Sequence, residues 1–239
     1  MELHYFKTLP STSTVATAEA KKGAPHLYTV IAEEQTAGRG RLQRSFFSPR
    51  GGLYFSTVLR TALTPAEYGA ITPFAALAVR RAIQSVCGVL VDVKWVNDLL
   101  YGGRKACGIL AESGTDLQGK PYVILGIGIN LQRVEFPGEL ADIATSIPCS
   151  DSKMLLQEIL LQLSHLENEV RSGAWLEEYR AACTFLGKEV SVIRGGEGQT
   201  AFALDILASG ALLVRYPNGS EEALCGGEIS LRLTQAPKK

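Results

Sequence analysis

The stretch VDVKWVNDLLYGGRKACGILAES, residues 91–113, has the pattern of two β-strands joined by a tight turn. Every second residue from Val91 to Trp95 is apolar, as on a strand that buries one face. The sequence YGGR at residues 101–104 is a hairpin signal, and residues 105–111 return as a second strand. We therefore expect an antiparallel hairpin, with a turn or bulge at the Asn-Asp pair that precedes it.

This hairpin would bring four polar side chains close together: Lys94, Asn97, Asp98 and Lys105. An acid, an amide and two amines in one place are suited to binding a polyphosphate with its metal ion and to polarising an acyl group. The alternative is a charged edge of the sheet, because edge strands commonly carry Lys and Asp that prevent aggregation. The hairpin alone leaves both interpretations open.

The sequence YVILGIGINL, residues 122–131, is apolar enough to be a central strand. Gly126 and Gly128 would weaken such a strand unless a ligand or a packed helix must approach its backbone closely. The two glycines lack the third glycine and the helix of a dinucleotide-binding fingerprint.

A polar loop, EEQTAGRGRLQRSFFSP at residues 33–49, connects two further predicted strands at residues 28–32 and 53–59. It carries three arginines among glycines: Arg39, Arg41 and Arg44. Guanidinium groups present fixed donors and stay charged, so such a loop is suited to phosphate or carboxylate. A solvated basic turn is the alternative.

The remaining pattern predicts an α+β protein. A strand is expected at residues 3–6, the STST run at residues 11–14 is a helix-capping signal, and from Lys188 five short alternating strands follow, typical of a small β-barrel. We predict a mixed β-sheet flanked by helices over residues 1–186 and a small barrel over residues 187–239. Helices are expected at residues 15–22, 66–86 with a kink or restart at Pro73, 155–166 and 174–185.

Composition restricts the function. The chain has 239 residues, of which 46% are hydrophobic, and its 24 basic residues balance 24 acidic ones. A net charge of zero disfavours a general binder of nucleic acid or of membrane surfaces, so any anion site must be local. The five cysteines are scattered without metal-ligand spacing, and no apolar run is long enough to span a membrane. We expect a cytoplasmic protein with reduced thiols.

Five motifs occur in an order that closely resembles the biotin-protein ligases, over residues 13–232. They are GRGRLQR at residues 38–44, KWVND at 94–98, RKACGIL at 104–110, GIGINL at 126–131 and GGEISLR at 226–232. The resemblance implies a class II synthetase-like catalytic domain with an SH3-like C-terminal barrel. It also suggests the form without an N-terminal DNA-binding domain, so we expect no DNA binding.

The resemblance implies an ATP-dependent reaction in two steps. Biotin would attack the α-phosphate of ATP to give biotinyl-5′-AMP and pyrophosphate, and Mg²⁺ would be held mainly by the ATP phosphates rather than by the chain. The ε-amine of one lysine on a biotin carboxyl carrier protein, of acetyl-CoA carboxylase or another biotin-dependent carboxylase, would then take the biotinyl group. The enzyme is expected to be a monomer or a homodimer.

The resemblance also assigns roles to individual residues. The catalytic residues would be Arg39, Arg41, Asp98 and Lys105. Biotin would contact Ser13, Thr14, Gln35, Arg39, Gly40, Arg41 and Lys105. The nucleotide would contact Arg41, Arg44, Phe46, Lys94, Asn97, Asp98, Asn130 and Arg232.

At three positions the chain departs from the family pattern. Val15 stands where an asparagine is usual, Val96 replaces a proline, and Phe46 replaces a tryptophan. Phe46 keeps a ring that could stack on a ligand but lacks the indole donor. No departure removes a charged residue, so activity is expected. A lipoate or octanoate ligase of the same fold and a non-catalytic biotin-binding protein are the alternatives.

Overall fold

The computed structural model describes residues 2–132, 134–226 and 230–233, with Gln43 and the last stretch described in backbone only. Seven strands form the main sheet in the order β1-β2-β3-β7-β6-β5-β4. β1 and β2 are parallel, whereas the other neighbours are antiparallel, so the sheet is mixed as predicted. The strands are β1 (Glu2–Leu9), β2 (Tyr28–Gln35), β3 (Leu53–Leu59), β4 (Asp92–Lys94), β5 (Asp98–Tyr101), β6 (Arg104–Thr115) and β7 (Pro121–Ile129).

The glycine-containing strand β7 lies in the middle of this sheet, as its apolar sequence predicted. It pairs with β3 on one side and with β6 on the other. Gly126 is aligned with Ser56 of β3, and Gly128 is aligned with Gly108 of β6. The predicted hairpin at residues 101–104 is also present between β5 and β6, with a bulge at Leu99/Leu100.

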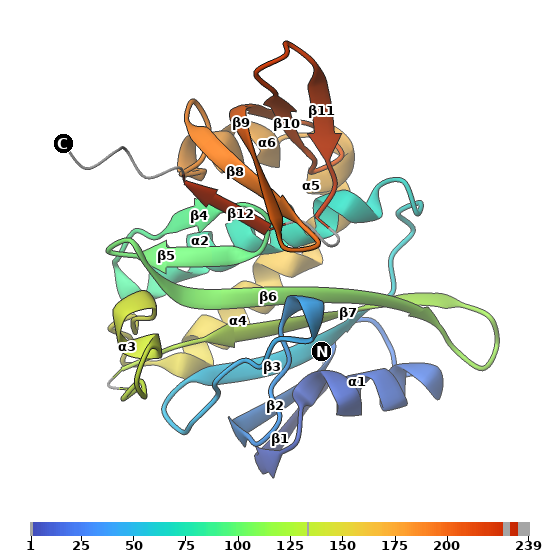
Figure 1. The fold of residues 1–239 in the computed structure, drawn as a ribbon. Helices are drawn as coiled ribbons and strands as arrows, with labels where there is room; N and C mark the ends of the chain where they lie inside the picture. The colour runs from blue at the N-terminus through green and yellow to red at the C-terminus, as the bar shows by residue number, and fades with distance from the viewer. Residues whose placement is uncertain (1, 133, 227–229, 234–239) are drawn as a thin grey trace.

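Helices cover both faces of the sheet (Figure 1). Helix α1 (Thr12–Lys21) packs on one face, where Ala16 and Ala20 meet Val30, Val58 and Ile124 in a small apolar cluster. Helix α2 (Ile71–Cys87) packs on the opposite face in the main core, with α4 (Ser152–Ser164) against it. Side chains alternate along a strand, so one strand supplies both clusters.

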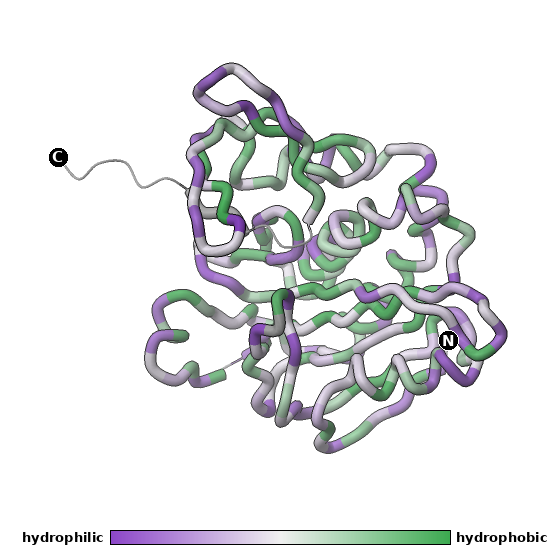
Figure 2. Tube along the Cα trace, turned by 45° about the vertical axis from the view of Figure 1, so that its right-hand side comes forward, coloured by the Kyte–Doolittle hydropathy of each residue, from purple (hydrophilic) through white to green (hydrophobic). Residues whose placement is uncertain are grey.

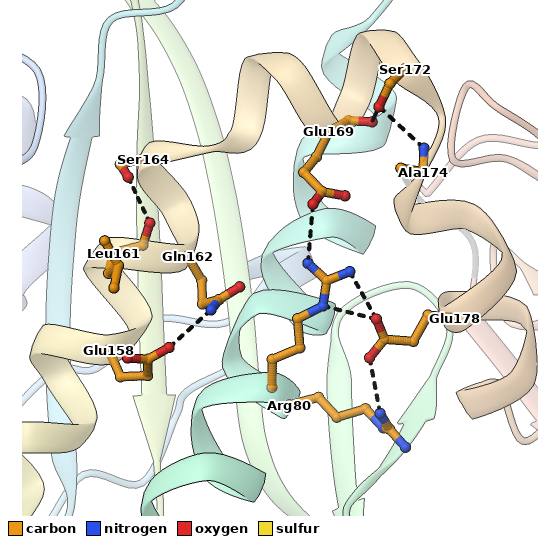
Figure 3. A network of polar contacts seen from close by, with 10 residues as sticks. Arg80, Glu158, Leu161, Gln162, Ser164, Glu169, Ser172, Ala174 and Glu178 are labelled. Carbon is orange, nitrogen blue, oxygen red and sulfur yellow. Dashed lines mark hydrogen bonds and ion pairs between the residues drawn. The ribbon is translucent and has the colours of Figure 1, made fainter.

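Ion pairs connect α2 to the short helices α5 (Leu166–Ser172) and α6 (Trp175–Ala182). Arg80 donates to the Glu178 carboxylate at 3.2 Å, and Arg81 donates to the same carboxylate at 2.8 Å. Arg81 also reaches Glu169 of α5 at 3.4 Å (Figure 3). The carboxylate of Glu178, which both arginines share, and that of Glu169 hold the three helices in a fixed arrangement behind the sheet. The remaining short helix, α3 (Leu140–Ile143), follows β7.

The helix starts predicted at residues 15, 66 and 155 differ from the observed starts at Thr12, Ile71 and Ser152. Helix α1 begins at Thr12 rather than at residue 15, and its N-cap Ser11 makes no side-chain capping bond. In the stretch predicted from residue 66, a 3-10 turn at Tyr68–Ala70 leads into α2, which begins at Ile71, two residues before the restart predicted at Pro73. Pro73 lies in the first turn of α2, where a missing amide hydrogen is tolerated. Residues 64–67 instead form a turn, in which the carboxylate of Glu67 accepts from the Thr64 amide at 2.7 Å.

The C-terminal strands form a separate five-stranded antiparallel sheet in the order β11-β10-β9-β8-β12. Closure of this sheet into an SH3-like barrel and the boundary at residue 187 stay predictions. Hydrophobic stretches run through the middle of the molecule, whereas many outer loops are hydrophilic (Figure 2). In the described part of the chain no helix is long and apolar enough to cross a membrane. The strands of the C-terminal sheet are β8 (Glu189–Arg194), β9 (Glu197–Ile206), β10 (Leu212–Arg215), β11 (Glu221–Leu224) and β12 (Ser230–Leu233).

Three contacts attach the C-terminal sheet to the rest of the protein. Arg180 of α6 binds Asp205 of β9 through two parallel bonds of 2.6 and 2.8 Å. The indole nitrogen of Trp95 donates to the carbonyl of Gly210 at 3.0 Å in a buried position. Gly210 has a φ of +81°, and a Cβ there would lie 2.5 Å from the carbonyl oxygen of Gly69. This close backbone approach requires glycine.

Replacement of Gly210 by alanine should therefore loosen the attachment. We expect Gly210→Ala to lower the free energy of unfolding by about 3 kcal/mol, because left-handed backbone strain adds to a clash with backbone atoms. Urea unfolding followed by fluorescence would measure the change. Gly219→Ala is the matched control, since Gly219 also has a positive φ, +86°, but no atom lies within 4 Å of the position that a Cβ would take there. Equal losses in the two variants would contradict the clash.

Candidate active site

A large cavity, of about 1040 Å³, lies where the arginine loop, the start of α1 and the middle of β4–β7 meet. Its far wall is formed by the C-terminal part of the chain, including Thr184, Lys188 and Ile193. The cavity therefore uses both parts of the protein. The sequence-predicted residues that line it are Ser13, Gln35, Arg39, Gly40, Arg41, Arg44, Phe46, Lys94, Asn97, Asp98, Lys105 and Asn130.

Two predicted residues do not join this set. Thr14 is exposed and does not line the cavity, because the first turn of α1 directs Thr12 and Ser13 toward the sheet instead. Thr12 lines the cavity instead. Arg232 belongs to β12, but its side chain lies outside the described residues.

At one end of the cavity Lys105 and Asp98 form an ion pair of 2.7 Å. β5 and β6 position them, because Asp98 begins β5 opposite Gly108, and Lys105 follows the hairpin turn. The Asp98 side chain is only 17% exposed, so solvent screens this pair less than a surface pair. Beneath them Cys107 is fully buried, and burial raises the pKa of its thiol, which disfavours the reactive thiolate.

Arg41 connects three parts of the site. Its guanidinium donates to Asn97 Oδ1 at 3.0 Å and to the carbonyl of Gly226 in the C-terminal part. Burial lowers the pKa of Arg41, while the carboxylate of Asp98 opposes this shift. The guanidinium nevertheless remains the charged form at neutral pH. One side chain of the loop thus reaches the β4–β5 turn and the C-terminal part together.

Arg39 leaves the same loop in another direction. It pairs with Glu112 of β6 at 2.9 Å, and both side chains are partly exposed. The loop itself is organised by backbone bridges, Arg39 with Ser45 and Gln35 with Ser48, and by a short 3-10 turn at Arg41–Gln43. The polar loop at residues 33–49 is therefore a folded, hairpin-like strap over the cavity.

The Phe46 ring lies on a floor made by glycines of the two central strands. A Cβ on Gly108 would lie 2.9 Å from this ring, and one on Gly128 would overlap it. The ring centroid is 5.7 Å from Lys105 Nζ, a cation–π distance, and 6.4 Å from the ring of Tyr54. The glycines in β6 and β7 are explained by this close approach.

At the other end of the cavity are neutral hydroxyl and amide groups. Thr12 and Ser13 contact Ser56 of β3 at 2.8 and 3.0 Å, and Thr12 also binds the carboxamide of Gln35. Gln35 in turn donates to Ser48 at 2.9 Å. Ser56, Ser48 and Glu112 were not predicted, because no local pattern separates them from ordinary strand and loop residues.

Asn130 supplies an unsatisfied acceptor. It is buried, and its amide nitrogen donates to the carbonyl of Thr145 at 3.2 Å. Its Oδ1 is buried without a hydrogen-bond partner among the described residues, and Asn130 lines the cavity. Buried polar atoms normally have partners, so a donor from a ligand would complete this one.

Comparisons with known proteins agree with this geometry. A family model described as the biotin/lipoate A/B protein ligase family matches residues 5–130, and the biotin protein ligase C terminal domain matches residues 185–232. The bifunctional ligase/repressor of Bacillus subtilis is 40% identical over 167 residues, covering 66% of this chain and 51% of that protein. The chain thus spans about half the length of that curated relative.

Two other relatives are covered over most of their length. The biotin–[acetyl-CoA-carboxylase] ligase of Mycobacterium tuberculosis is 30% identical over 241 residues, covering 93% of this chain and 86% of that protein. The biotin protein ligase of Aquifex aeolicus in complex with biotin and ATP superimposes with a TM-score of 0.81 at 28% identity, covering 98% and 99% of the two chains. These matches show that the chain belongs to the biotin/lipoate A/B protein ligase family and carries the C-terminal domain of its biotin protein ligases.

Proposed function

We propose that this protein is a biotin-protein ligase, which activates biotin with ATP and transfers it to a lysine of a biotin carboxyl carrier protein. The observation that carries the proposal is the order of chemistry along the cavity. Neutral hydroxyl and amide groups lie at one end, the Phe46 ring over glycines lies in the middle, and Lys105 with Asp98 lies at the other end. Biotin has a matching order: an uncharged polar head, an apolar chain and a carboxylate.

The spacing of the strands beneath the cavity supports this orientation. Ser56 of β3 and Asp98 of β5 are separated by three strand spacings in the sheet order, or roughly 14 Å. A slender acid bound along this direction would place its carboxylate beside Lys105. Lys105 would neutralise that carboxylate, and Arg39 and Arg41 would close the strap over it. The two arginines already have partners, Glu112 and Asn97, which hold the strap in position.

In the proposed first step the biotin carboxylate attacks the α-phosphate of ATP and pyrophosphate leaves. Negative charge develops on the phosphate oxygens, and preorganised donors lower the barrier most where charge develops. We assign this role to Lys105 of the polar hairpin and to Arg41, which donates to Asn97 of the same hairpin. We assign Arg44, Lys94, Asn97 and Asn130 to the nucleotide. Arg232 is assigned to the nucleotide by family resemblance.

We propose that the magnesium ion is brought by the nucleotide and held mainly by its phosphates. Among the described residues no cluster of three or more His, Cys, Asp or Glu could hold a metal ion. Asp98 and the unpartnered Oδ1 of Asn130 are oxygen groups on the cavity wall. Mg²⁺ usually combines one or two protein oxygens with substrate phosphates, so these two are the residues that would meet it. The ion would neutralise charge on the transferred phosphate.

In the second step the carrier lysine must lose a proton before its amine attacks the acyl carbon of the adenylate, which forms an amide bond and releases AMP. Asp98 is the only carboxylate paired directly with Lys105 among the described residues, and it lies at the reacting end of the cavity. We assign Asp98 to orient or deprotonate the incoming amine. The carrier protein as acceptor is part of the same proposal. A cytoplasmic setting is also part of it, and the five free thiols support that setting, because reduced cysteines are usual there.

The alternative activity, ligation of lipoate or octanoate, is disfavoured by the neutral end of the cavity. Thr12, Ser13 and the carboxamide of Gln35 line this end of the cavity. An apolar dithiolane or alkyl chain facing these groups would leave hydrogen-bonding capacity unused, which weakens binding. A protein that only binds biotin is disfavoured by the ion-paired hairpin at the opposite end, because simple binding does not require a carboxylate beside the ligand carboxylate.

Exchange of labelled pyrophosphate into ATP tests the first step. We expect exchange with biotin and none with lipoate, and Lys105→Ala should reduce the rate at least about 100-fold, because it removes a donor to developing charge. Lys153→Ala is the control, since Lys153 is an exposed lysine on α4. Exchange with lipoate alone would move the assignment to the sister activity. No exchange with either acid would support a binding protein.

A single-turnover experiment tests the role of Asp98. Preformed biotinyl-adenylate and carrier protein should react about 100-fold more slowly with Asp98→Asn, because the amide cannot accept the proton of the lysine amine. Increasing pH should partly restore the rate by deprotonating the amine without the enzyme. Glu177→Gln, on the exposed side of α6, controls for loss of a negative charge. A full transfer rate with Asp98→Asn would refute the assignment.

A further inference from the structure

A buried serine lies directly behind the neutral end of the cavity. Ser56 is fully buried on β3 and does not line the cavity. Its hydroxyl lies 2.8 Å from the hydroxyl of Thr12 and 3.0 Å from that of Ser13, and both of these residues do line the cavity. Ser56 can therefore influence a ligand only through these two side chains.

The carboxamide of Gln35 has a defined orientation. Its oxygen accepts from the backbone amide of Thr12 at 2.8 Å, and an amide hydrogen can only donate. Its nitrogen donates to Ser48 at 2.9 Å, and the Ser48 hydroxyl donates to the carbonyl of Phe46 at 2.9 Å. Backbone groups at both ends thus determine which atom of Gln35 faces Thr12.

This orientation determines the direction of every following hydrogen bond. The hydroxyl of Thr12 lies 3.1 Å from the oxygen of Gln35, which cannot donate, so Thr12 must supply its one hydrogen there. The 2.8 Å contact between Thr12 and Ser56 then uses the hydrogen of Ser56. The 3.0 Å contact between Ser56 and Ser13 must consequently use the hydrogen of Ser13.

Ser13 is left as an acceptor. Its only hydrogen points to Ser56, and Ser56 is the sole partner of its hydroxyl within the described residues. The free lone pairs are available to the cavity that Ser13 lines. Gly126 leaves the necessary room, because a Cβ there would lie 2.8 Å from the Ser13 oxygen.

We infer that Ser56 is a positioning residue that makes Ser13 an obligatory hydrogen-bond acceptor, so that the cavity selects a ligand with an N–H donor at this point. The inference rests on the proposed function, in which that donor is one ureido N–H of biotin. A ligand with an acceptor at the same position would place that acceptor against the Ser13 oxygen, with no hydrogen between the two atoms. Selectivity for the ureido ring then depends on a residue that never touches it.

The test uses two biotin analogues in which one or the other ureido N–H is replaced by oxygen. Each analogue is a cyclic carbamate of nearly unchanged shape, and only one replaces the N–H that faces Ser13. Dissociation constants measured by titration calorimetry on the wild-type protein should differ between the two analogues by about 100-fold, the cost of facing an acceptor with an acceptor. We call the ratio of the two dissociation constants the gap between the analogues.

Two variants should narrow this gap. Ser56→Ala lets the Ser13 hydroxyl turn and donate to the ring oxygen, so we expect the gap to decrease about tenfold. Thr12→Val removes the hydroxyl that forces Ser56 to donate away from Ser13, and should have the same effect without altering either serine. Thr57→Val is the matched control, because Thr57 is a buried β3 hydroxyl that pairs with Thr29 instead.

The outcomes are distinct. A gap that is absent in the wild type, that persists in the folded variants, or that narrows equally in Thr57→Val would overturn the inference. If Ser56→Ala does not fold by circular dichroism, Thr12→Val decides the question alone. Failure of the wild type to bind biotin itself would refute the proposed function and this inference together, whereas biotin binding with equal affinities for the two carbamates would refute only the inference.

Discussion

Close approach to the backbone of the two central strands is the constraint on which the rest of the site depends. Gly108, Gly126 and Gly128 lie on neighbouring positions of β6 and β7, and side chains there would collide with Phe46 or Ser13. Central strands normally gain stability from packed side chains on both faces, and glycine gives this up. Here the opposite face is covered by α2 and the main core, which leaves one face free to form a cavity floor.

The electrostatic organisation is local. A chain with no net charge concentrates Arg39, Arg41, Arg44, Lys94 and Lys105 around one cavity and provides Glu112 and Asp98 as internal partners for two of them. Such partners keep cationic side chains ordered before a ligand arrives. An anionic substrate then exchanges contacts with groups that are already in place, which costs less entropy than ordering a free loop.

The strap also makes the cavity a property of the whole chain. Arg41 contacts Asn97 of the main sheet and the carbonyl of Gly226 in the C-terminal part, while Arg180 and Trp95 attach that part at separate points. Movement of the C-terminal sheet would thus shift the strap, because the Arg41 guanidinium connects the two. The C-terminal part of the chain therefore contributes both a wall of the cavity and a support for the strap that covers it.

The sequence by itself determined the succession of strands and helices along the chain, the central place of residues 122–131, the hairpin at residues 101–104, and twelve of the residues that line the cavity, through motifs with strong local patterns. Only the tertiary structure decided that Thr12 rather than Thr14 faces the cavity, since two positions along a helix turn a side chain by about 200°. It also decided the pairing of Arg39 with Glu112 and the hydroxyl chain through Ser56, which join residues 73 and 44 positions apart. Local propensity contains no information about such partners, because they meet only when separate strands are aligned in the sheet.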